Sequence, residues 1–386
     1  MKICFYCNSI YSFGGVQRVL ATISSELAKN HQVTILTLDP QERVEEIYKL
    51  HKSIRVKHIK YERLPIIEYI PSKLYALLYK TILPKTNFTT RLYGLTSFPK
   101  SRRLLLANHI ENNKYNIVVG VHVFLSFHLA AITNQISSKT IGWMHNSYEA
   151  FFYGKHAYIR NQEKRFKYQM TNLNKIIVLS NSDKHLFQSK LNVPTTRIYN
   201  PLTITSSSVA DYSSKTFLAV GRLVPQKGFD ILIEAFAKFS EHNSEWKLNI
   251  IGDGPEKPLL DSIIERDNLS DRVKIHSFTK NIEQFYKESS IYILSSRWEG
   301  FGLVLFEAMQ YKLPLIVSDI PIVKELLSNK EFAYVFKNED SSHLASQMAQ
   351  LSSSQELEKI GDMAYKYSEQ FRINNIIKEW DILFKS

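Results

Sequence analysis

The chain has 386 residues, of which 44% are hydrophobic and 22% charged, and a formal net charge of +12. This composition is typical of a globular protein, and the length exceeds what one hydrophobic core usually fills, so we expect two domains. The longest apolar stretch, 121–132, is too short to span a bilayer, and the apolar run 3–7 is too short for a signal peptide. These features argue against a membrane-spanning protein and predict a cytoplasmic one.

Short β-rich runs alternate with helical patterns through the first two hundred residues. The predicted strands are 2–7, 33–38, 54–59, 117–121, 140–144 and 175–179, and the first predicted helix is 16–29. Such alternation is typical of a parallel sheet covered by helices. We therefore expect residues 1–200 to form an N-terminal Rossmann-like domain of the α/β class.

The two cysteines, Cys4 and Cys7, stand three residues apart in the first predicted strand. Side chains three apart on a strand point to opposite faces, and the sequence has no second cysteine pair to complete a metal site. We therefore expect two buried, reduced thiols and no metal.

Two adjacent glycines, Gly14 and Gly15, lie between the first predicted strand and the first predicted helix. Glycines at such a place let the backbone approach a ligand closely and leave the amides of the helix N-terminus free to face an anion. A turn before a helix also needs glycine for its geometry alone, so this pair fits a binding loop and an ordinary turn equally well.

Most of the excess positive charge falls in residues 51–110, which contain twelve lysines and arginines against two glutamates. Within it, residues 72–83 lie between two prolines and read as a short helix, with Lys73 and Lys80 on one side and apolar residues elsewhere. Such helices lie at membrane interfaces, so we predict that residues 60–112 face an anionic membrane surface and make the protein peripheral on its inner face. The alternative is a helix packed in the first domain with solvated lysines. No nucleic-acid-binding motif accompanies the charge, so we expect no nucleic-acid partner.

One histidine, His145, follows the predicted strand 140–144. A lone histidine is more often structural than catalytic, so its position alone assigns it no role.

The alternation of strand and helix patterns stops at residues 201–214. This segment is rich in serine, and its composition predicts a linker. The alternation then restarts with predicted strands at 216–220, 246–251, 273–276, 291–294 and 315–317, and predicted helices at 227–240, 256–266 and 302–311. We therefore expect residues 215–365 to form a second Rossmann-like domain. The segment 366–386 has helical spacing and no strand signal, and we expect it to cross back to the first domain.

Two cations, Arg222 and Lys227, stand five residues apart directly after the first strand of the second domain. Ligands of α/β proteins bind at the carboxyl ends of parallel strands, so these cations are well placed to neutralise a diphosphate. Solvated surface cations are the alternative, and the position after the strand favours binding. We expect both cations on an exposed loop rather than in the core.

Two carboxylates, Glu299 and Glu307, frame a loop and the start of a predicted helix. Gly300 and Gly302 precede that helix, whose first amides, at 301–304, can hold phosphate oxygens. A carboxylate suits sugar hydroxyls because it accepts two hydrogen bonds in fixed directions, so one glutamate can bind a sugar and the other a ribose. An ordinary glutamate at a helix start explains either residue singly. It does not explain why both glutamates occur together with the two glycines in the sequence from Glu299 to Glu307.

Taken in order, these motifs resemble those of family 4 glycosyltransferases. The residues that carry the resemblance are Gly14–Gly15, His145, Asn200–Pro201, Gly221–Arg222, Lys227–Gly228, Gly252–Asp253–Gly254 and the string from Glu299 to Glu307. The resemblance covers nearly the whole chain, although residues 60–112 lie outside it. It implies the GT-B fold, in which two Rossmann-like parallel-sheet domains face each other across a cleft.

The resemblance also implies a nucleotide diphosphate sugar donor held mainly by the second domain. The donor-binding residues that it implies there are Arg222, Lys227, Gly300, Phe301, Gly302, Leu303 and Glu307. The two cations would bind the diphosphate and Glu307 the ribose. The main chain of Phe301, Gly302 and Leu303 would bind the phosphates and the sugar ring.

In the first domain the resemblance implies that Gly14 and Gly15 approach the same diphosphate. His145 would hydrogen-bond the sugar near the reacting carbon and Glu299 would hold the transferred sugar, so these two are the candidate catalytic residues. Such enzymes retain the anomeric configuration and need no metal or cofactor besides the donor. The implied donor is a UDP-linked hexose or N-acetylhexosamine. The implied acceptor is a glycan or lipid-linked glycan of a bacterial surface polysaccharide, capsule or lipopolysaccharide, and the resemblance implies that residues 1–200 bind it.

Three other functions compete with this interpretation. A nicotinamide-dependent enzyme is disfavoured because the third glycine of a dinucleotide fingerprint starting at Gly252 would fall at Lys257. A sugar-nucleotide epimerase shares the architecture, and a non-catalytic nucleotide- or glycan-binding protein would share the site. The products separate them, since only a transferase yields free nucleotide and a sugar joined to an acceptor.

Overall fold

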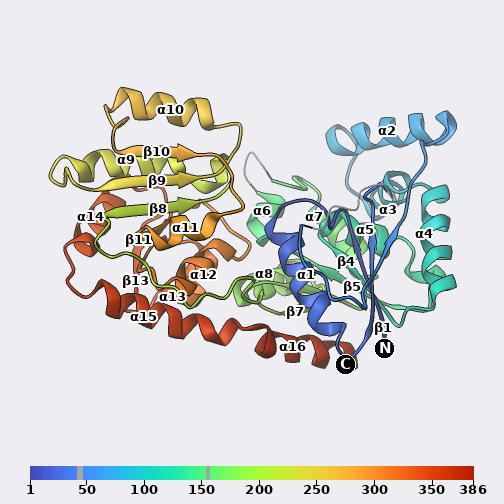
Figure 1. Cartoon of the computed structure of the whole chain (residues 1–386). Helices are drawn as coiled ribbons and strands as arrows, with labels where there is room; N and C mark the ends of the chain where they lie inside the picture. Colours follow the sequence, from blue (N-terminus) through green and yellow to red (C-terminus); the bar gives the residue numbers. More distant parts are fainter. Residues whose placement is uncertain (41–46, 154–156) are drawn as a thin grey trace. The chain divides into compact units, whose positions relative to one another are not determined.

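The computed structural model describes residues 1–40, 47–153 and 157–386. The chain forms two compact units, one made of Met1–Pro201 with Ile373–Ser386 and the other of Leu202–Arg372 (Figure 1). Across these described ranges, no helix is both long and apolar enough to cross a membrane.

Unit 1 contains a sheet of seven parallel strands in the order β3-β2-β1-β4-β5-β6-β7. The strands are β1 (Lys2–Cys7), β2 (Gln32–Thr37), β3 (Arg55–His58), β4 (Ile117–Val121), β5 (Lys139–Trp143), β6 (Lys175–Val178) and β7 (Thr195–Arg197). The short edge strand β7 was not expected from the sequence, because three residues are too few to show a period. The chain order reverses direction between β1 and β4, and this is where ligands bind in open α/β sheets.

Helices cover the sheet of unit 1. They are α1 (Gly15–Leu27), α2 (Ile66–Thr81), α3 (Asn87–Ser97), α4 (Lys100–Asn113), α5 (Val123–Ala130), α6 (Tyr148–Phe152), α7 (Glu163–Met170), α8 (Asn181–Leu191) and α16 (Ile373–Lys385), with a 3-10 turn at Thr133–Gln135. The C-terminal helix α16 packs against α1 and buries Trp380 completely. The Trp380 ring lies 4.8 Å from Trp143 and 6.0 Å from Phe5, so α16 is part of this hydrophobic core.

The two cysteines are buried and free on β1, as expected. Burial raises the pKa of both thiols, to about 12 for Cys7, so both are protonated at neutral pH.

Helix α2 differs from its prediction. The expected helix began after Pro71, but α2 begins at Ile66 and contains Pro71. The amides of Glu68 and Tyr69 both donate to the carbonyl of Pro65, so the first turn is closed before Pro71 is reached. Pro71 lies in the second turn and removes only one helical hydrogen bond, the one to the carbonyl of Ile67. Ile67 is exposed, and the helix continues past Pro71 to Thr81.

Unit 2 contains a sheet of six parallel strands in the order β10-β9-β8-β11-β12-β13. The strands are β8 (Thr216–Val220), β9 (Lys247–Ile251), β10 (Val273–His276), β11 (Ile291–Leu294), β12 (Leu315–Ser318) and β13 (Ala333–Phe336). Its order reverses between β8 and β11. Both sheets are therefore parallel and doubly wound, which confirms the predicted α/β class of two such domains.

The helices of unit 2 are α9 (Phe229–Ser240), α10 (Lys257–Arg266), α11 (Ile282–Lys287), α12 (Leu303–Gln310), α13 (Pro321–Leu327), α14 (Ser341–Ser352) and α15 (Leu357–Ser368), with 3-10 turns at Pro225–Lys227 and Glu369–Phe371. The serine-rich segment expected as a linker belongs to this unit from Leu202 onward. The amides of Ala210 and Asp211 donate to the carbonyls of Tyr311 and Lys287, so its second half is held against the unit.

Candidate functional site

Two loops of unit 2 emerge at the point where its strand order reverses. One loop (221–228) follows β8 and the other (295–302) follows β11. Because β8 and β11 are paired parallel neighbours, both loops leave the same edge of the sheet. The predicted donor residues of unit 2 lie in these two loops and in α12, which begins directly after the second loop.

Lys227 and Glu299 form an ion pair that joins the two loops. Their side chains are only 13% and 8% exposed, so the expectation that Lys227 stands on an exposed loop is wrong. The Ser296 hydroxyl donates to Glu299 Oε1 over 2.8 Å. Gly221 leaves room for the stem of Lys227, since a Cβ there would lie 3.0–3.2 Å from the Lys227 side-chain carbons. Packing and pairing therefore fix the position of both charges.

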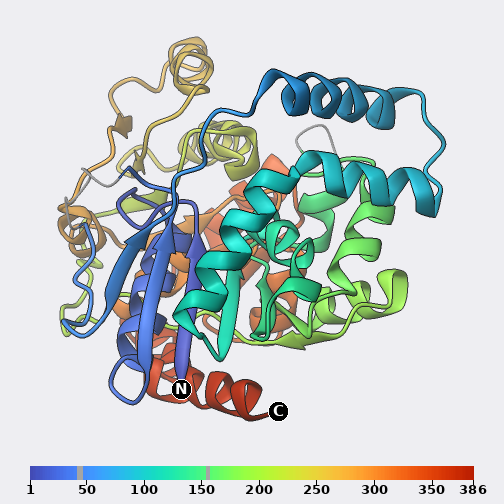
Figure 2. The ribbon, with the colours of Figure 1, turned by 90° about the vertical axis from the view of Figure 1, so that its right-hand side faces the viewer.

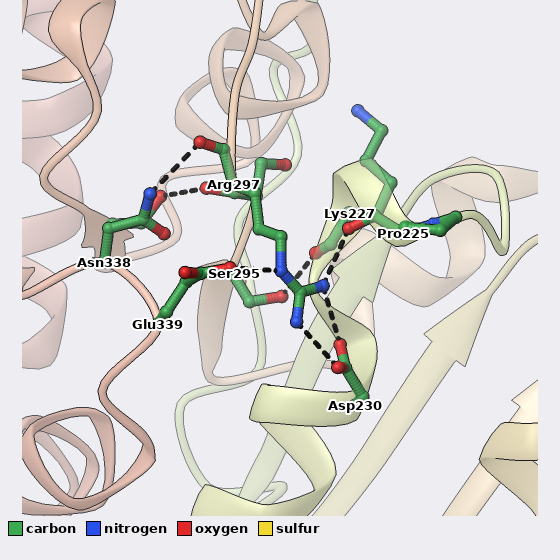
Figure 3. Close-up of polar contacts among 9 residues, drawn as sticks. Pro225, Lys227, Asp230, Ser295, Arg297, Asn338 and Glu339 are labelled. Atoms are coloured by element: carbon green, nitrogen blue, oxygen red, sulfur yellow. Dashed lines mark hydrogen bonds and ion pairs between the residues drawn. The ribbon is translucent and has the colours of Figure 1, made fainter. Parts of the chain in front are cut away.

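Arg297 holds the same two loops together from the side of α9 (Figure 3). Its guanidinium donates to Asp230 Oδ1 and Oδ2 over 3.0 and 2.7 Å, and to the Pro225 carbonyl over 2.7 Å. Its Nε donates to Glu339 over 2.6 Å. Hydrogen bonds to Asp230 raise the pKa of Arg297 further, so this cation stays charged and acts as a fixed clamp.

Main-chain contacts complete this clamp. The Ser295 hydroxyl donates to the Lys227 carbonyl over 2.8 Å (Figure 3), and the Arg297 amide donates to the Gln226 carbonyl over 2.8 Å. Gln226 Nε2 donates to the Trp298 carbonyl over 3.0 Å. The loops that carry Lys227 and Glu299 therefore form one connected structure.

Glycines let the backbones of this region approach closely. Gly228 has a φ of +61°, and a Cβ there would lie 2.3 Å from the Ser295 carbonyl oxygen. A Cβ at Gly252 or Gly254 would lie 1.8 or 2.2 Å from the carbonyl oxygens of Gly221 or Leu223. The Gly–Asp–Gly motif after β9 therefore packs against the loop that carries Arg222.

Arg222 is exposed in the loop after β8. The structure shows no hydrogen bond or ion pair for its guanidinium within the described residues, whereas Lys227 is already paired. Arg222 can therefore bind an anion without first breaking an internal contact.

Glu307 lies on α12 and is 5% exposed. The Tyr286 hydroxyl donates to its Oε2 over 3.1 Å. α12 begins at Leu303 after Gly302, which has a φ of +78° and serves as its N-cap. The first amides of a helix have no acceptor within it, so this N-terminus can bind an anion.

At Gly300 and Phe301, which precede Gly302, the main chain rather than the side chain is available to the candidate site. Phe301 is buried and its ring stacks on Phe306 at 4.7 Å, and Gly300 is also buried. The aromatic ring of Phe301 thus anchors the loop in the core of unit 2.

In unit 1, Gly14 and Gly15 follow β1 and lead into α1. The Tyr48 hydroxyl accepts a hydrogen bond from the Gly14 amide over 2.9 Å and lies 3.2 Å from the Gly14 carbonyl oxygen, to which it can donate. These contacts hold the glycine turn at the end of β1, next to the strand-order reversal of the sheet.

Two histidines follow the neighbouring strands β4 and β5: His122 is half-buried and His145 is buried. His145 is 7% exposed, and its Nε2 has no hydrogen-bond partner in the described part of the chain. Burial lowers the pKa of His145 well below its ordinary value and that of His122 to about 4, so both imidazoles are neutral. The His122 amide donates to the Trp143 carbonyl over 2.8 Å. A neutral, buried ring nitrogen without a partner is suited to hydrogen-bond a substrate hydroxyl.

Sequence reasoning missed the partners of these residues. It assigned no role to His122, Tyr48, Asp230 or Tyr286, and none to Arg297, although Arg297 lies inside the recognised string. No sequence signal marks such pairs, because Asp230 and Arg297 are 67 positions apart. Among the described residues, no group of three or more His, Cys, Asp or Glu side chains could hold a metal ion.

Family models match both parts of the chain. A model described as Glycosyltransferase Family 4 matches residues 13–204, and one described as Glycosyl transferases group 1 matches residues 203–367. Between them they contain every predicted site residue of both units.

Two relatives match over nearly their whole length. An uncharacterized glycosyltransferase of Haemophilus influenzae is 27% identical over 384 residues, which cover 98% of this chain and 98% of the relative. The amylovoran biosynthesis glycosyltransferase AmsD of Erwinia amylovora is 25% identical over 389 residues, which cover 99% of each.

Solved structures share the fold. A variant of TarM from S. aureus, in complex with fondaparinux, α-GlcNAc-glycerol and UDP, matches with a TM-score of 0.79 at 17% identity and full coverage of both chains. HepE of Anabaena in complex with UDP matches with a TM-score of 0.74 at 16% identity and full coverage of both chains. At this identity the likeness concerns the fold alone, and it confirms the expected GT-B fold.

Proposed function

The chain belongs to the family 4 glycosyltransferases, and from that premise we propose that it transfers a hexose or N-acetylhexosamine from a UDP-linked donor with retention of configuration. The proposed acceptor is a glycan or lipid-linked glycan of a bacterial surface polysaccharide. Support for this acceptor class comes from the relative AmsD, whose name places it in amylovoran biosynthesis. Support for UDP comes from the complexes of TarM and HepE.

The observation that carries this proposal is the set of charges at the strand-order reversal of unit 2. Exposed Arg222 and clamped Lys227 supply two cations for a diphosphate, and the N-terminus of α12 supplies amides. Glu299 and Glu307 supply carboxylates for hydroxyl groups. A diphosphate bearing a sugar at one end and a ribose at the other would use all of them.

The chemistry assigned to these groups is electrostatic. The acceptor hydroxyl attacks the anomeric carbon on the same face as the leaving diphosphate. At the same time the bond between that carbon and the diphosphate oxygen breaks. The nucleotide diphosphate takes the electron pair of the broken bond, and its departing oxygen accepts the proton of the acceptor hydroxyl. Arg222, Lys227 and the helix N-terminus stabilise the charge that develops on the diphosphate, a role that is often worth several kcal/mol in the transition state. We propose that these groups, rather than a metal, serve this purpose.

Besides binding a hydroxyl group, Glu299 also positions Lys227. Their ion pair holds the ammonium group in place, so that only a small rearrangement turns it toward a phosphate oxygen. In the proposed mechanism Glu299 then accepts a hydrogen bond from a hydroxyl of the transferred sugar. His145 of unit 1 hydrogen-bonds the same sugar through its Nε2, which has no partner among the residues described. Gly14 and Gly15 approach the diphosphate through their main chain.

We further propose that the protein works at the inner face of a membrane. Five aliphatic side chains of α2 are each more than half exposed: Ile66, Ile67, Ile70, Leu74 and Leu77. At 100° per residue they fall on one side of the helix, beside Lys73 and Lys80. An apolar stripe bordered by lysines suits the headgroup region of an anionic bilayer.

The experiment that tests the function is a screen of sugar nucleotides with product analysis. Purified protein is incubated with UDP-glucose, UDP-galactose and their N-acetylated forms, with and without lipid-linked glycan acceptors. Release of free UDP with a sugar joined to the acceptor supports the proposal, and the anomeric configuration of the product tests retention. An isomerised donor would indicate the epimerase alternative. Binding of UDP without turnover of any donor would indicate a non-catalytic protein.

A further inference from the structure

Unit 1 contains a cavity of about 700 Å³ between α2, α3, the start of α4 and the segment that leads into α2. This volume is typical of sites for small organic ligands. One face of α2 lines the cavity with Tyr69, Ser72, Lys73 and Ala76, which stand at helical spacing. None of the residues predicted to bind the donor or the transferred sugar lines it, so the cavity is a separate feature of the unit.

Among the residues that the structure describes, the lining contains three cations, Arg63, Lys73 and Arg102, and no carboxylate. The two glutamates of the surrounding segment, Glu62 and Glu68, lie outside the lining. The Nε of Arg102 is buried and has no hydrogen-bond partner among the residues that the structure describes. Its Nη2 donates only weakly, to the Glu62 carbonyl over 3.3 Å. An anion in the cavity would supply an acceptor for Arg102 and a counter-charge for all three cations.

A fourth cation lies beneath the cavity wall. Arg165 is 7% exposed, and its guanidinium donates to Ser97 Oγ over 2.6 Å, where Ser97 itself lines the cavity. Its other hydrogen bonds go to the amide oxygens of Gln162 and Gln169. Its hydrogen bonds in the described chain therefore go to neutral oxygens and none to a carboxylate. The guanidinium also lies over the rings of Tyr93 and Phe127, 4.4 and 4.3 Å from their centroids, which partly stabilise its charge. An anion on the other side of Ser97 would add the counter-charge that these neutral groups do not supply.

The same helix carries the exposed aliphatic stripe. Figures 1 and 2 both show α2 at the periphery of unit 1, with α3 as its neighbour. Lys73 and Tyr69 turn toward the cavity, while Ile70 and Leu74 stand on the adjacent, exposed side of the helix. A cationic cavity and an apolar stripe therefore share one helix.

We propose that this cavity binds the phosphate or diphosphate headgroup of a lipid-linked acceptor, whose hydrocarbon chain lies along the exposed stripe of α2. The inference rests on the proposed function and deepens it, because it identifies the acceptor as an anionic amphiphile. A soluble phosphate ester would use the cations but leave the stripe in water. A neutral glycolipid would cover the stripe but leave Arg63, Lys73 and Arg102 without a counter-ion.

Calorimetric titration of the full chain tests this inference with three probes. Farnesyl diphosphate, held below its micellar concentration, carries both the diphosphate and the chain, whereas inorganic pyrophosphate and farnesol each carry one of them. Excess UDP is present throughout to occupy a donor site in unit 2. Farnesyl diphosphate is expected to bind at least about tenfold more tightly than either partial probe, because charge-assisted and apolar contacts act together.

Two double variants assign the binding to the cavity. R63Q/K73Q removes two cations that make no hydrogen bond in the described chain, and is expected to weaken farnesyl diphosphate binding by about tenfold or more. K164Q/K167Q is the matched control, with the same loss of charge on exposed lysines of α7 in the same unit but outside the lining and away from the stripe. I70N/L74N should weaken farnesyl diphosphate binding and leave pyrophosphate binding unchanged. L104N/L105N, on exposed leucines of α4, is its control.

The outcomes separate this inference from the proposed function. Equal binding of farnesyl diphosphate and pyrophosphate would overturn the lipid assignment in favour of a soluble phosphate ligand. Equal binding by wild type and R63Q/K73Q, with unchanged thermal unfolding, would overturn the cavity itself. Either result leaves UDP-sugar turnover as an independent test of unit 2. Conversely, absence of sugar transfer with intact farnesyl diphosphate binding would remove the proposed function while keeping the anion site.

Discussion

Lys227 and Glu299 stand 72 positions apart in the sequence and meet in a mostly buried ion pair at the strand-order reversal of unit 2. The pair joins a cation expected to bind a diphosphate to a carboxylate expected to bind a sugar. Because each partner positions the other, neither can be changed without disturbing both proposed contacts.

Changing either partner should therefore produce coupled losses. K227M and E299Q are each expected to lower kcat/KM for the donor by about 10- to 100-fold, since a charge-assisted contact is worth about 1.5–3 kcal/mol. For E299Q the loss should fall more on turnover than on UDP affinity. In a double-mutant cycle, K227M/E299Q should cost clearly less than the sum of the single variants. Strict additivity, in kinetics and in thermal unfolding alike, would show that the pair has no shared role.

Arg222 is expected to act without such coupling, because it is exposed and unpaired among the described residues. R222A should weaken donor use by about 10- to 100-fold and leave the unfolding temperature unchanged. K247A removes a charge from an exposed side chain on β9 and serves as control. Steady-state kinetics with both variants decide the matter, and near-normal kinetics for R222A would remove it from the donor site.

Glu307 is expected to recognise the ribose, with Tyr286 holding one of its oxygens. E307Q should weaken UDP binding by about tenfold or more, with a smaller effect on turnover at saturating donor. The sharper measurement compares UDP with its 2′,3′-dideoxy analogue by calorimetry. Wild type should prefer UDP, and E307Q should lose most of that preference. If E307Q discriminates the two ligands as well as wild type does, the ribose assignment is wrong. Y286F, which leaves the carboxylate in place, should show an intermediate effect.

Two half-buried histidines with lowered pKa values should make unit 1 sensitive to acid. Burial lowers the pKa of His122 to about 4 and that of His128 to about 3, against 6.5 in the unfolded chain. Below pH 6.5 the unfolded chain therefore binds protons that the folded unit does not, so the free energy of unfolding falls as the pH falls. Each histidine contributes a slope of about 1.4 kcal/mol per pH unit between pH 6.5 and its folded pKa, and no slope above pH 6.5.

Hydrogen exchange of peptides from β4 and α5, corrected for the intrinsic pH dependence of exchange, measures this slope for unit 1 alone. H128Q should reduce the slope by about one proton between pH 6 and pH 4.5. H185Q, at an exposed position of α8, should leave it unchanged. The same slope in H128Q and wild type would mean that His128 is protonated in the folded unit.

The exposed stripe of α2 should bind anionic vesicles. I67N/L74N is expected to reduce co-sedimentation with phosphatidylglycerol vesicles severalfold. The change replaces two aliphatic side chains, each more than half exposed, that would otherwise be buried in the bilayer. K73Q/K80Q should reduce it mainly at low salt, where the attraction of the lysines is least screened. L259N changes an exposed leucine of unit 2 and is the control. Equal sedimentation of all four proteins, or none by wild type, would contradict the membrane proposal.

Much of the fold could be predicted from the sequence. The bounds expected for β1, β4, β8, β10 and β11 agree with the structure at both ends. Apart from β10, which alternates apolar and polar residues, these strands are mostly apolar runs. A local pattern of either kind can be read from the sequence without its tertiary context. The edge strands β7 and β13 escaped prediction, because they are short and only partly buried.

The candidate site was predicted less completely. The loops that carry Arg222, Lys227, Glu299 and the glycines before α12 were found from their position after strands, since the carboxyl ends of parallel strands lie at one edge of the sheet. The exposed setting expected for Lys227 was wrong, because the sequence does not reveal that Glu299 lies opposite it.

By itself, the sequence determined which segments form strands and helices, where charges cluster, and which motifs follow strand ends. These features depend on side-chain periodicity and on neighbours a few residues away. Only the tertiary structure decided that Arg297 clamps Asp230, that α16 completes the core of unit 1 around Trp380, and that α2 continues through Pro71 to border a cationic cavity. Such contacts join residues far apart in the chain, and they are selected by packing and by the pairing of buried charges, which no local pattern records.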